Sequence, residues 1–522
     1  MYTGMNKDAS KTKTIATSVS YVTVIMILSR MLAFVSNQIA LTTYGTGGYM
    51  DIYSYVTTIP NTIFNVFGTA LGTVVIPIYA GHLAKGEDKE AARFANNIIT
   101  ISTAFTAVLV LIGIGLSPLL PLLTSFNSGE EYSFAVKALM AMMPIMIFYG
   151  LNYIFQGILQ SRGKYGWPAF VSVPSSLVVI IYVFTLGDKY GVAGLLAATF
   201  IGLSLQALIL IPPAIAAGFR YRPSFELKNE DLISAYKMTL PIILGVSAYQ
   251  FNMFFNAQMI ANFDGMVSLT NTVQHMVVYM VLAFVYSVTA VVYPRLSASV
   301  SKGNMDEYKQ TISVVLKAMT ALLLPVTFGF IAVRRPLLQL VLNWGEITDT
   351  DINRAVILLV IYSVSIIGVG LKEVIDRAFY AIKSTIIPAV NGVVIMVVNV
   401  VLGIVLINFF GAYGIPAAYS AAAIIGLIVQ LILLKKKIGT FCPGLGADFI
   451  KCLISSIAMA AAATAAEYGM DMLLKSDGVA MRIIKLGVPV AIGVIVYAIL
   501  VIILKVSVVS PVIDKVKSIL KK

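Results

Sequence analysis

Long apolar runs, separated by short polar segments, dominate the chain from residue 14 to residue 508. A helix of about 20 apolar residues crosses the hydrocarbon core of a membrane, which is about 30 Å thick. The runs predict fourteen spans, at residues 14–42, 49–80, 91–124, 132–161, 165–187, 191–218, 231–262, 266–293, 310–341, 352–382, 385–410, 413–434, 448–474 and 480–508. The pattern therefore predicts an all-α integral membrane protein with fourteen transmembrane helices.

Short motifs recur along the chain at offsets of 217 to 224 residues. Segment 76–86 resembles 293–303, 159–169 resembles 379–389, and 190–206 resembles 413–430. The offset spans six helices, so the halves have parallel topology, which places a substrate site between them. We expect a cytoplasmic tail (1–13), an N-lobe (14–222), a C-lobe (223–438), an additional helix pair (439–508) and a basic cytoplasmic tail (509–522).

Composition excludes several classes of protein. The chain is 59% hydrophobic and 12% charged, whereas soluble proteins carry about 25% charged residues. Cys442 and Cys452 are too few for a disulfide framework or a thiolate metal site. His82 and His275 are far apart in sequence, and neither an HExxH nor a Walker A pattern occurs. The sequence therefore predicts neither an ATP-driven pump nor a metalloenzyme, and no cofactor.

The basic residues predict the orientation of the spans. With the N-terminus in the cytoplasm, inner segments hold 24 of the 37 basic residues, outer segments hold 8, and 5 fall within spans. This asymmetry satisfies the positive-inside rule and places both termini in the cytoplasm. The net charge of +13 lies in short loops between spans, so it does not indicate nucleic-acid binding. Outer loops are too short for a catalytic domain, which argues against an enzyme.

Arg30 lies inside the first predicted span. Inserting a charge at this depth costs roughly 2.5–3.5 kcal/mol on insertion scales, so a charged residue there indicates a functional role. Its guanidinium can bind a phosphate bidentately. The alternative is a structural pair with Asp51 or with backbone carbonyl groups.

Amide side chains form further polar sets within spans. The candidate substrate contacts are Asn61 and Asn65 in span 2, Asn252 and Asn256 in span 7, and Asn271, Gln274 and His275 in span 8. Members of the two asparagine pairs are one helical turn apart and share a helix face. The alternative for every set is an interhelical hydrogen bond.

Charged residues suggest gates or ion-coupling sites. Asp51 follows a glycine turn near the outer surface, where it is either a gate carboxylate or a helix N-cap. Span 10 carries Lys372, Glu373, Asp376 and Arg377, in which each basic residue and an acidic residue are four apart. This set is either a self-neutralised cluster or a gate that couples transport to Na⁺ or H⁺.

Several segments, in chain order, resemble motifs of one family. Residues 29–34 (SRMLAF) resemble its SR-x-L-G-F motif, and residues 44–51 its FGAG…DAF. IPN at 59–61, IPI at 76–78, PRLS at 294–297 and RAFY at 377–380 resemble its IPN, VPV, PRLS and RAFY. The chain thus resembles the MurJ/MviN lipid II flippases, within the multidrug/oligosaccharidyl-lipid/polysaccharide exporter superfamily.

This resemblance implies two six-helix lobes around a central cavity, and two C-terminal helices that form a groove for a lipid tail. It implies an alternating-access flippase that carries lipid II, an undecaprenyl-pyrophosphate-linked peptidoglycan precursor, to the outer leaflet of a bacterial cell membrane. Arg30 and Asp51 match positions important in the family. We expect a monomer whose partners are the lipid-linked glycan, membrane lipids and cell-wall synthesis proteins.

The chain departs from the family pattern at four places. Ser36 and Asn37 replace an arginine and an aspartate, Phe64-Asn65 replaces an arginine pair, and His275 replaces an arginine. A pyrophosphate would therefore meet a weaker positive field, which keeps open a flippase for another lipid-linked polysaccharide. A cation-coupled multidrug antiporter of the same superfamily is the second alternative, with Glu373 and Asp376 as its carboxylates.

Overall fold

The computed structural model of the protein describes residues 25, 28–226, 228–229, 231, 233, 247, 250–382, 384–473 and 478–507. All regular elements in these ranges are helices, which confirms the predicted all-α class. Both terminal tails and parts of the predicted spans 1, 7, 13 and 14 lie outside the described residues.

The described part of the chain contains ten helices long and apolar enough to cross a membrane. One of them, Ile386–Ile438, joins two of the predicted spans: α16 (Ile386–Phe410) and α17 (Gly414–Ile438), with the short helix η3 (Gly411–Tyr413) between them. The chain is therefore a multi-pass membrane protein, and the total of fourteen spans stays a prediction.

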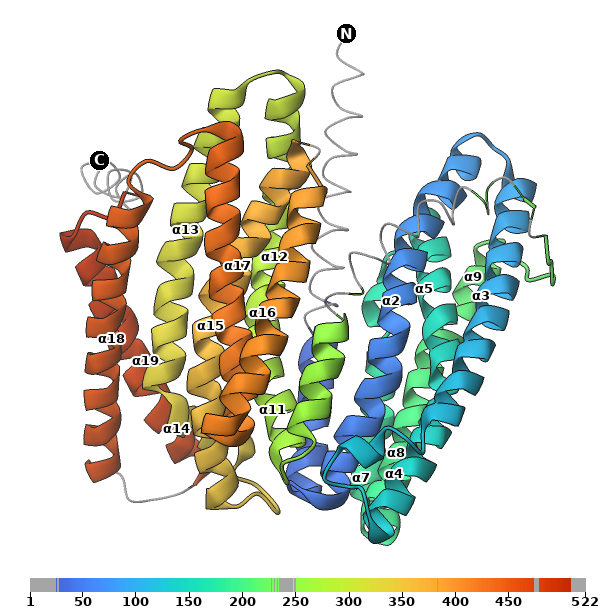
Figure 1. Ribbon diagram of the computed structural model, residues 1–522, viewed down its shortest axis with the longest axis horizontal. Coiled ribbons are helices and arrows are strands. Elements are labelled where there is room, and N and C mark those ends of the chain that lie inside the picture. The colour runs from blue at the N-terminus through green and yellow to red at the C-terminus, as the bar shows by residue number, and fades with distance from the viewer. Residues whose placement is uncertain are drawn as a thin grey trace. The chain divides into compact units, whose positions relative to one another are not determined.

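The chain divides into two compact units, Met1–Ser268 and Leu269–Lys522. Besides helical residues 28–44 and 250–260, the first unit contains α2 (Gly48–Ala84), α3 (Asp88–Leu116), η1 (Pro121–Leu123), α4 (Gly129–Met142), α5 (Ile145–Ser161), α6 (Gly166–Phe170), α7 (Val173–Thr185), α8 (Gly187–Leu208) and α9 (Ile211–Ala216). Figure 1 shows α2, α3 and α5 running side by side. Tyr79, Phe94, Phe155 and Phe219 are buried in the core that these helices share with α9.

Prolines interrupt several predicted spans of this unit. Span 132–161 is two helices, α4 and α5, because Pro144 has no backbone N–H to continue the first. Span 191–218 likewise divides into α8 and α9, with Pro212 and Pro213 at the start of α9. Proline is well tolerated in a first helical turn, so each break begins a new helix.

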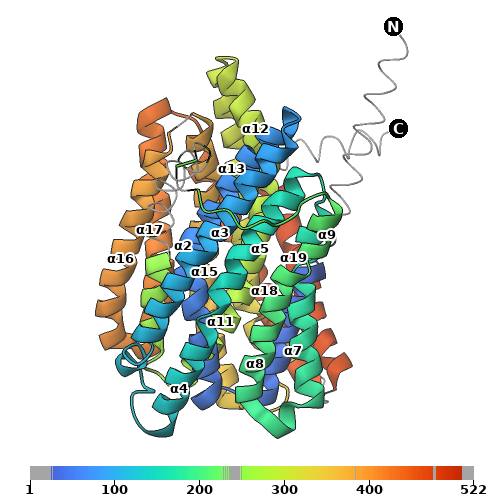
Figure 2. The same cartoon turned by 90° about the vertical axis from the view of Figure 1, so that its right-hand side faces the viewer.

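One close approach shapes the first unit. Helices α7 and α8 form a hairpin (Figure 2), and a Cβ at Gly202 would lie 2.8 Å from the Ser175 Cα. Only glycine lets the two backbones come this close without a shift.

The second unit contains the helices from α12 onward. They are α12 (Met280–Ser301), α13 (Met305–Ala332), α14 (Arg334–Leu342), α15 (Asp349–Ala381), α16, α17, α18 (Leu445–Leu473) and α19 (Val479–Ile503). Helix α11 (Met266–Gln274) crosses the division between the units and continues as a π-helix, η2 (His275–Tyr279). Predicted span 310–341 ends early, because α13 stops at Ala332 and α14 begins separately.

The last two helices, α18 and α19, pack against α13 (Figure 1). The Tyr497 hydroxyl donates to the Ala321 carbonyl oxygen at 2.6 Å. Lys317 on α13 forms an ion pair with Asp448 on α18, with 3.3 Å between Nζ and Oδ2. A half-buried lysine thus holds the additional helix pair to the rest of its unit.

A repeated contact agrees with the internal repeat. Asn152 Nδ2 on α5 donates to Gln206 Oε1 on α8 at 3.4 Å. In the second unit, Gln430 Nε2 on α17 donates to Asp376 Oδ1 on α15 at 2.6 Å. Each residue of the second pair lies 224 positions after its counterpart, which is an offset found in the sequence. The two units thus build the same helix contact with different chemistry.

Candidate functional site

Arg30 lies on the helix over residues 28–44 and is exposed. Within the described part of the chain it forms no ion pair, and Asp51 bonds elsewhere, so the Arg30–Asp51 pair considered from the sequence is not formed. Its guanidinium therefore remains available for an anion.

Asp51 lies in the first turn of α2 and is completely buried. Its Oδ1 accepts hydrogen bonds from the Ser268 backbone N–H at 3.0 Å and from the Ser268 hydroxyl at 2.7 Å. Ser268 lies in the first turn of α11, so Asp51 caps the N-terminus of α11 and not that of its own helix. The N-cap of α2 is Gly47, and the Gly48 N–H is bound by Asp264. Asp51 thus connects the first turn of α2 to the first turn of α11 through buried hydrogen bonds.

Asn61 and Asn65 form one polar group on α2. Asn65 Nδ2 donates to Asn61 Oδ1 at 2.5 Å, and the Tyr153 hydroxyl of α5 donates to Asn65 Oδ1 at 3.1 Å. Asn61 is exposed, and the Tyr153 ring stacks on Phe64 with 6.2 Å between ring centroids. This amide and hydroxyl group suits contacts with sugar or peptide groups of a substrate.

The candidates of span 7 are inside the first unit. Asn252 and Asn256 are buried, and each has a polar interaction. The neighbouring Gln258 is also buried; it accepts from the Tyr55 hydroxyl at 2.8 Å and donates to the Leu120 carbonyl at 3.3 Å. Substrate contact by Asn252 and Asn256 stays a prediction, with an interhelical hydrogen bond as its alternative.

The candidates of span 8 belong to the second unit. Asn271 is half-buried and Gln274 buried on α11, whereas His275 is exposed at the start of the π-helix η2. The His275 ring lies 4.7 Å from the Tyr279 ring, centroid to centroid. π-Helical turns are frequent at functional sites, so His275 is the member of this set best placed to meet a ligand.

The charged residues of α15 form two ion pairs along one helix, as their spacing predicts. Lys372 Nζ lies 2.6 Å from Asp376 Oδ2, and Arg377 binds Glu373 Oε1 through Nε at 2.9 Å. The Gln430 bond adds a second partner to Asp376. Every carboxylate here has a cation beside it, which supports the self-neutralised cluster over a cation-binding site.

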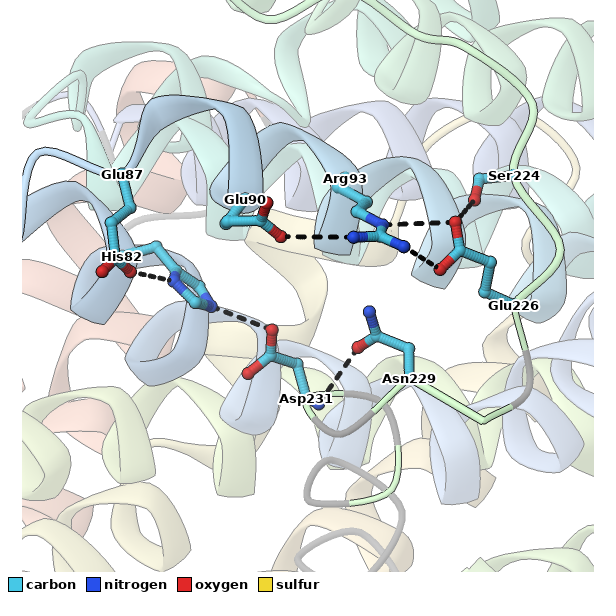
Figure 3. Close-up of polar contacts among 8 residues, drawn as sticks. All are labelled: His82, Glu87, Glu90, Arg93, Ser224, Glu226, Asn229 and Asp231. Carbon is cyan, nitrogen blue, oxygen red and sulfur yellow. Dashed lines mark hydrogen bonds and ion pairs between the residues drawn. The ribbon is translucent and has the colours of Figure 1, made fainter.

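A further charged cluster, missed by the sequence analysis, lies where α2 ends and α3 begins (Figure 3). His82 contacts Glu87 and Asp231, and Arg93 contacts Glu226. Asp231 is 149 residues from His82 in the chain, so no spacing rule relates the two. Among the described residues, no group of three histidine, cysteine or acidic side chains is arranged to hold a metal ion.

Comparison with known proteins identifies similar chains. The family described as "Lipid II flippase MurJ" matches residues 40–489. A Vibrio cholerae protein named "Probable lipid II flippase MurJ" is 24% identical over 423 residues, which cover 78% of this chain and 80% of the relative. A protein of Bdellovibrio bacteriovorus with the same name is 22% identical over 457 residues, covering 86% of this chain and 87% of the relative.

Solved structures show the same fold. A structure of lipid II flippase MurJ in an inward closed conformation superposes with a TM-score of 0.77 at 22% identity, covering 92% of this chain and 97% of the other. An inward-facing multidrug resistance transporter of the MATE family gives a TM-score of 0.65 at 16% identity, covering 80% of this chain and 98% of the other.

Proposed function

Since this chain belongs to the lipid II flippase MurJ family, we propose that it carries lipid II from the inner to the outer leaflet of the bacterial cell membrane. The observation that carries the proposal is Arg30, an exposed guanidinium on an apolar helix that has no ion-pair partner in the described structure. Such a group is expensive in a membrane and suits an anionic ligand.

Arg30 binds the pyrophosphate of the substrate in this proposal. A guanidinium donates two parallel hydrogen bonds to phosphate oxygens, so it fixes the orientation of the headgroup as well as its charge. The Asn61–Asn65–Tyr153 group contacts the sugar or the peptide. Binding and release alternate between the two membrane faces, with both termini in the cytoplasm.

The ion pairs of α15 argue against cation-coupled drug antiport. Such a transporter needs a carboxylate that binds a cation in one step of its cycle and loses it in another. Asp376 already has Lys372 at 2.6 Å and Gln430 at 2.6 Å. An internal lysine occupies the place that Na⁺ or H⁺ would take, so we expect the energy source to be the membrane potential or an ion bound elsewhere.

The proposal is tested in proteoliposomes loaded with labelled lipid II. An impermeant enzyme or dye reports lipid II that reaches the opposite leaflet. Arg30→Ala is expected to reduce the flipping rate by about 10- to 100-fold, since a hydrogen bond to a charged group contributes about 1.5–3 kcal/mol. Arg30→Lys keeps the charge but loses bidentate binding and should be intermediate.

The matched control is Arg220→Ala, which removes an exposed arginine beyond α9. It should flip lipid II at the wild-type rate. A second substrate, an undecaprenyl-pyrophosphate glycan without a peptide, distinguishes lipid II from another lipid-linked polysaccharide. Faster flipping of this second substrate would reassign the glycan while keeping the transporter class, whereas unchanged flipping by Arg30→Ala would remove Arg30 from the mechanism.

A further inference from the structure

The segment that leaves α9 is described at residues 217–226, 228, 229 and 231, and side chains of α3 bind its backbone at several of these positions. The Asn97 side chain both accepts from the Glu226 N–H at 2.8 Å and donates to the Glu226 carbonyl at 2.8 Å. Asn96 accepts from the Arg222 N–H at 3.1 Å, and Thr100 accepts from the Ser224 N–H at 3.3 Å. We call this segment the strap. Side chains of α3 satisfy the hydrogen-bonding groups of its backbone.

Charged side chains fasten the strap further along. Arg93 Nε and one of its terminal nitrogens donate to the two carboxylate oxygens of Glu226, at 3.2 and 2.7 Å (Figure 3). This two-point contact fixes the direction of both side chains. Arg93 and Glu226 are about half exposed, so their contribution to stability is small, and their role is mainly one of position.

At the far end of the strap, His82 lies between two carboxylates. Its Nδ1 is 2.8 Å from Glu87 Oε2 and its Nε2 is 3.0 Å from Asp231 Oδ2 (Figure 3). Glu87 is the N-cap residue of α3, His82 lies in the last turn of α2, and Asp231 ends the strap. One imidazole ring therefore joins a helix end, a helix start and the strap.

This geometry has a chemical requirement. An ionised carboxylate only accepts hydrogen bonds, and a neutral imidazole has only one N–H to donate. Both contacts are satisfied together only when both ring nitrogens carry a proton. The arrangement is thus complete with one bound proton, and loss of that proton leaves a ring nitrogen and a carboxylate oxygen facing each other as two acceptors.

We propose that His82, Glu87 and Asp231 form a proton-binding latch that fastens the strap to the α2–α3 turn and releases it when His82 loses its proton. The latch lies on the predicted cytoplasmic face, and its ligand is the proton itself. The proposal goes beyond lipid II transport, since it concerns the hold on the strap whatever the substrate.

The charges around the latch support a bound proton. Lys85 flanks Glu87 on the turn, Arg93 on α3 pairs with both Glu90 and Glu226, and Asp231 belongs to the strap. The hydrogen bond that His82 donates to Glu87, followed by the one that it donates to Asp231, raises the pKa of His82 above its ordinary value of 6.5. The same contact lowers the pKa of Glu87. The latch is therefore closed below the ordinary histidine range and opens as the pH rises through the raised pKa.

Histidine NMR tests the bound proton directly, because the chain contains only His82 and His275. The protein is labelled with ¹³C at histidine Cε1 and titrated in lipid nanodiscs, with His275→Asn leaving a single resonance. We expect a midpoint above 6.5 that falls in Asp231→Asn and in Glu87→Gln. A midpoint at or below 6.5 in the wild type would overturn the proposal, and so would one that neither variant moves.

Spin labels test the release of the strap in the folded protein. Labels are placed at Lys89 and Lys228, which are exposed on α3 and on the strap, after replacement of Cys442 and Cys452. Electron–electron distance distributions are compared at about pH 6 and about pH 9, which bracket histidine titration. We expect a narrow distribution at the lower pH and a broader one at the higher pH.

His82→Gln is the decisive variant, because glutamine carries no titratable proton. It should show one distribution at both pH values. Asn97→Ala removes two backbone bonds of the strap and should broaden the distribution at both pH values while leaving the His82 midpoint in place. A wild-type distribution that is independent of pH would contradict the latch, as would a pH-dependent broadening that persists in His82→Gln.

Discussion

The corresponding helix contact is neutral in the first unit (Asn152–Gln206) and contains a carboxylate in the second (Asp376–Gln430). The first prediction concerns replacing the charged residues of the second unit with the neutral ones of the first. Asp376 pairs with Lys372 at 2.6 Å on α15, with 7% and 22% of their side chains exposed. At the positions 224 residues earlier, the first unit carries Asn152 and Phe148. The double variant Lys372→Phe with Asp376→Asn therefore gives the second unit the neutral chemistry that already occurs in the first.

The structure determines the expected magnitudes. Removing one partner of a buried ion pair costs about 3–5 kcal/mol, because the other charge stays buried alone. Lys372 keeps part of its side chain in contact with solvent, so Asp376→Asn and Lys372→Phe should each lower the free energy of unfolding by about 2–4 kcal/mol. The double variant should lose less than about 1 kcal/mol, since neutral replacement of a buried pair is often harmless.

The assay is a double-mutant cycle on the purified protein, with the free energy of unfolding measured by denaturant titration in mixed micelles. Lys302→Met, which removes an exposed lysine before α13, is the control and should change stability by less than about 0.5 kcal/mol. Additive single effects, with a coupling energy below about 0.5 kcal/mol, would refute a stabilising pair. Full lipid II flipping by the stable double variant would show that these charges serve structure only.

Three further predictions concern the close helix approach, the buried carboxylate and the latch. Gly202→Ala should lower the melting temperature, whereas Gly392→Ala, where a Cβ meets no atom within 4 Å, should raise it slightly through helix propensity. Asp51→Ala should cost about 1–3 kcal/mol of unfolding free energy because two Ser268 donors lose their acceptor; an unchanged unfolding curve would refute this fastening. The raised pKa of His82 means that its contribution to stability is complete below the unfolded pKa and is lost as the pH rises through the folded pKa, so melting curves of wild type and His82→Gln should converge at high pH.

Features within one helix could be predicted from the sequence. The length and apolar character of residues 385–410 and 413–434 identify α16 and α17 almost to their ends. The ion pairs of α15 follow from a spacing of four residues, which places two side chains on one face. These predictions are confirmed because the interactions that determine them join residues within a few helical turns of one another.

Contacts between distant segments could not be predicted in this way. Asp51 meets Ser268 across 217 residues, and His82 meets Asp231 across 149. Neither partner has a distinctive neighbourhood, and each polar residue has many alternatives of the right chemistry along the chain. Only the packing of α2 with the surrounding helices selects the partner. For this reason the sequence left two roles open for Asp51, a gate carboxylate and a helix N-cap.

We propose that this chain flips lipid II with Arg30 as its anion contact. The most direct measurement expresses the wild type and Arg30→Ala in a bacterium depleted of its own lipid II flippase, and assays lipid II at the outer surface. We expect the wild type to restore surface lipid II and Arg30→Ala, present in the membrane at equal amount, to fail to restore it. Wild-type protein that inserts in the membrane yet restores no surface lipid II would contradict it.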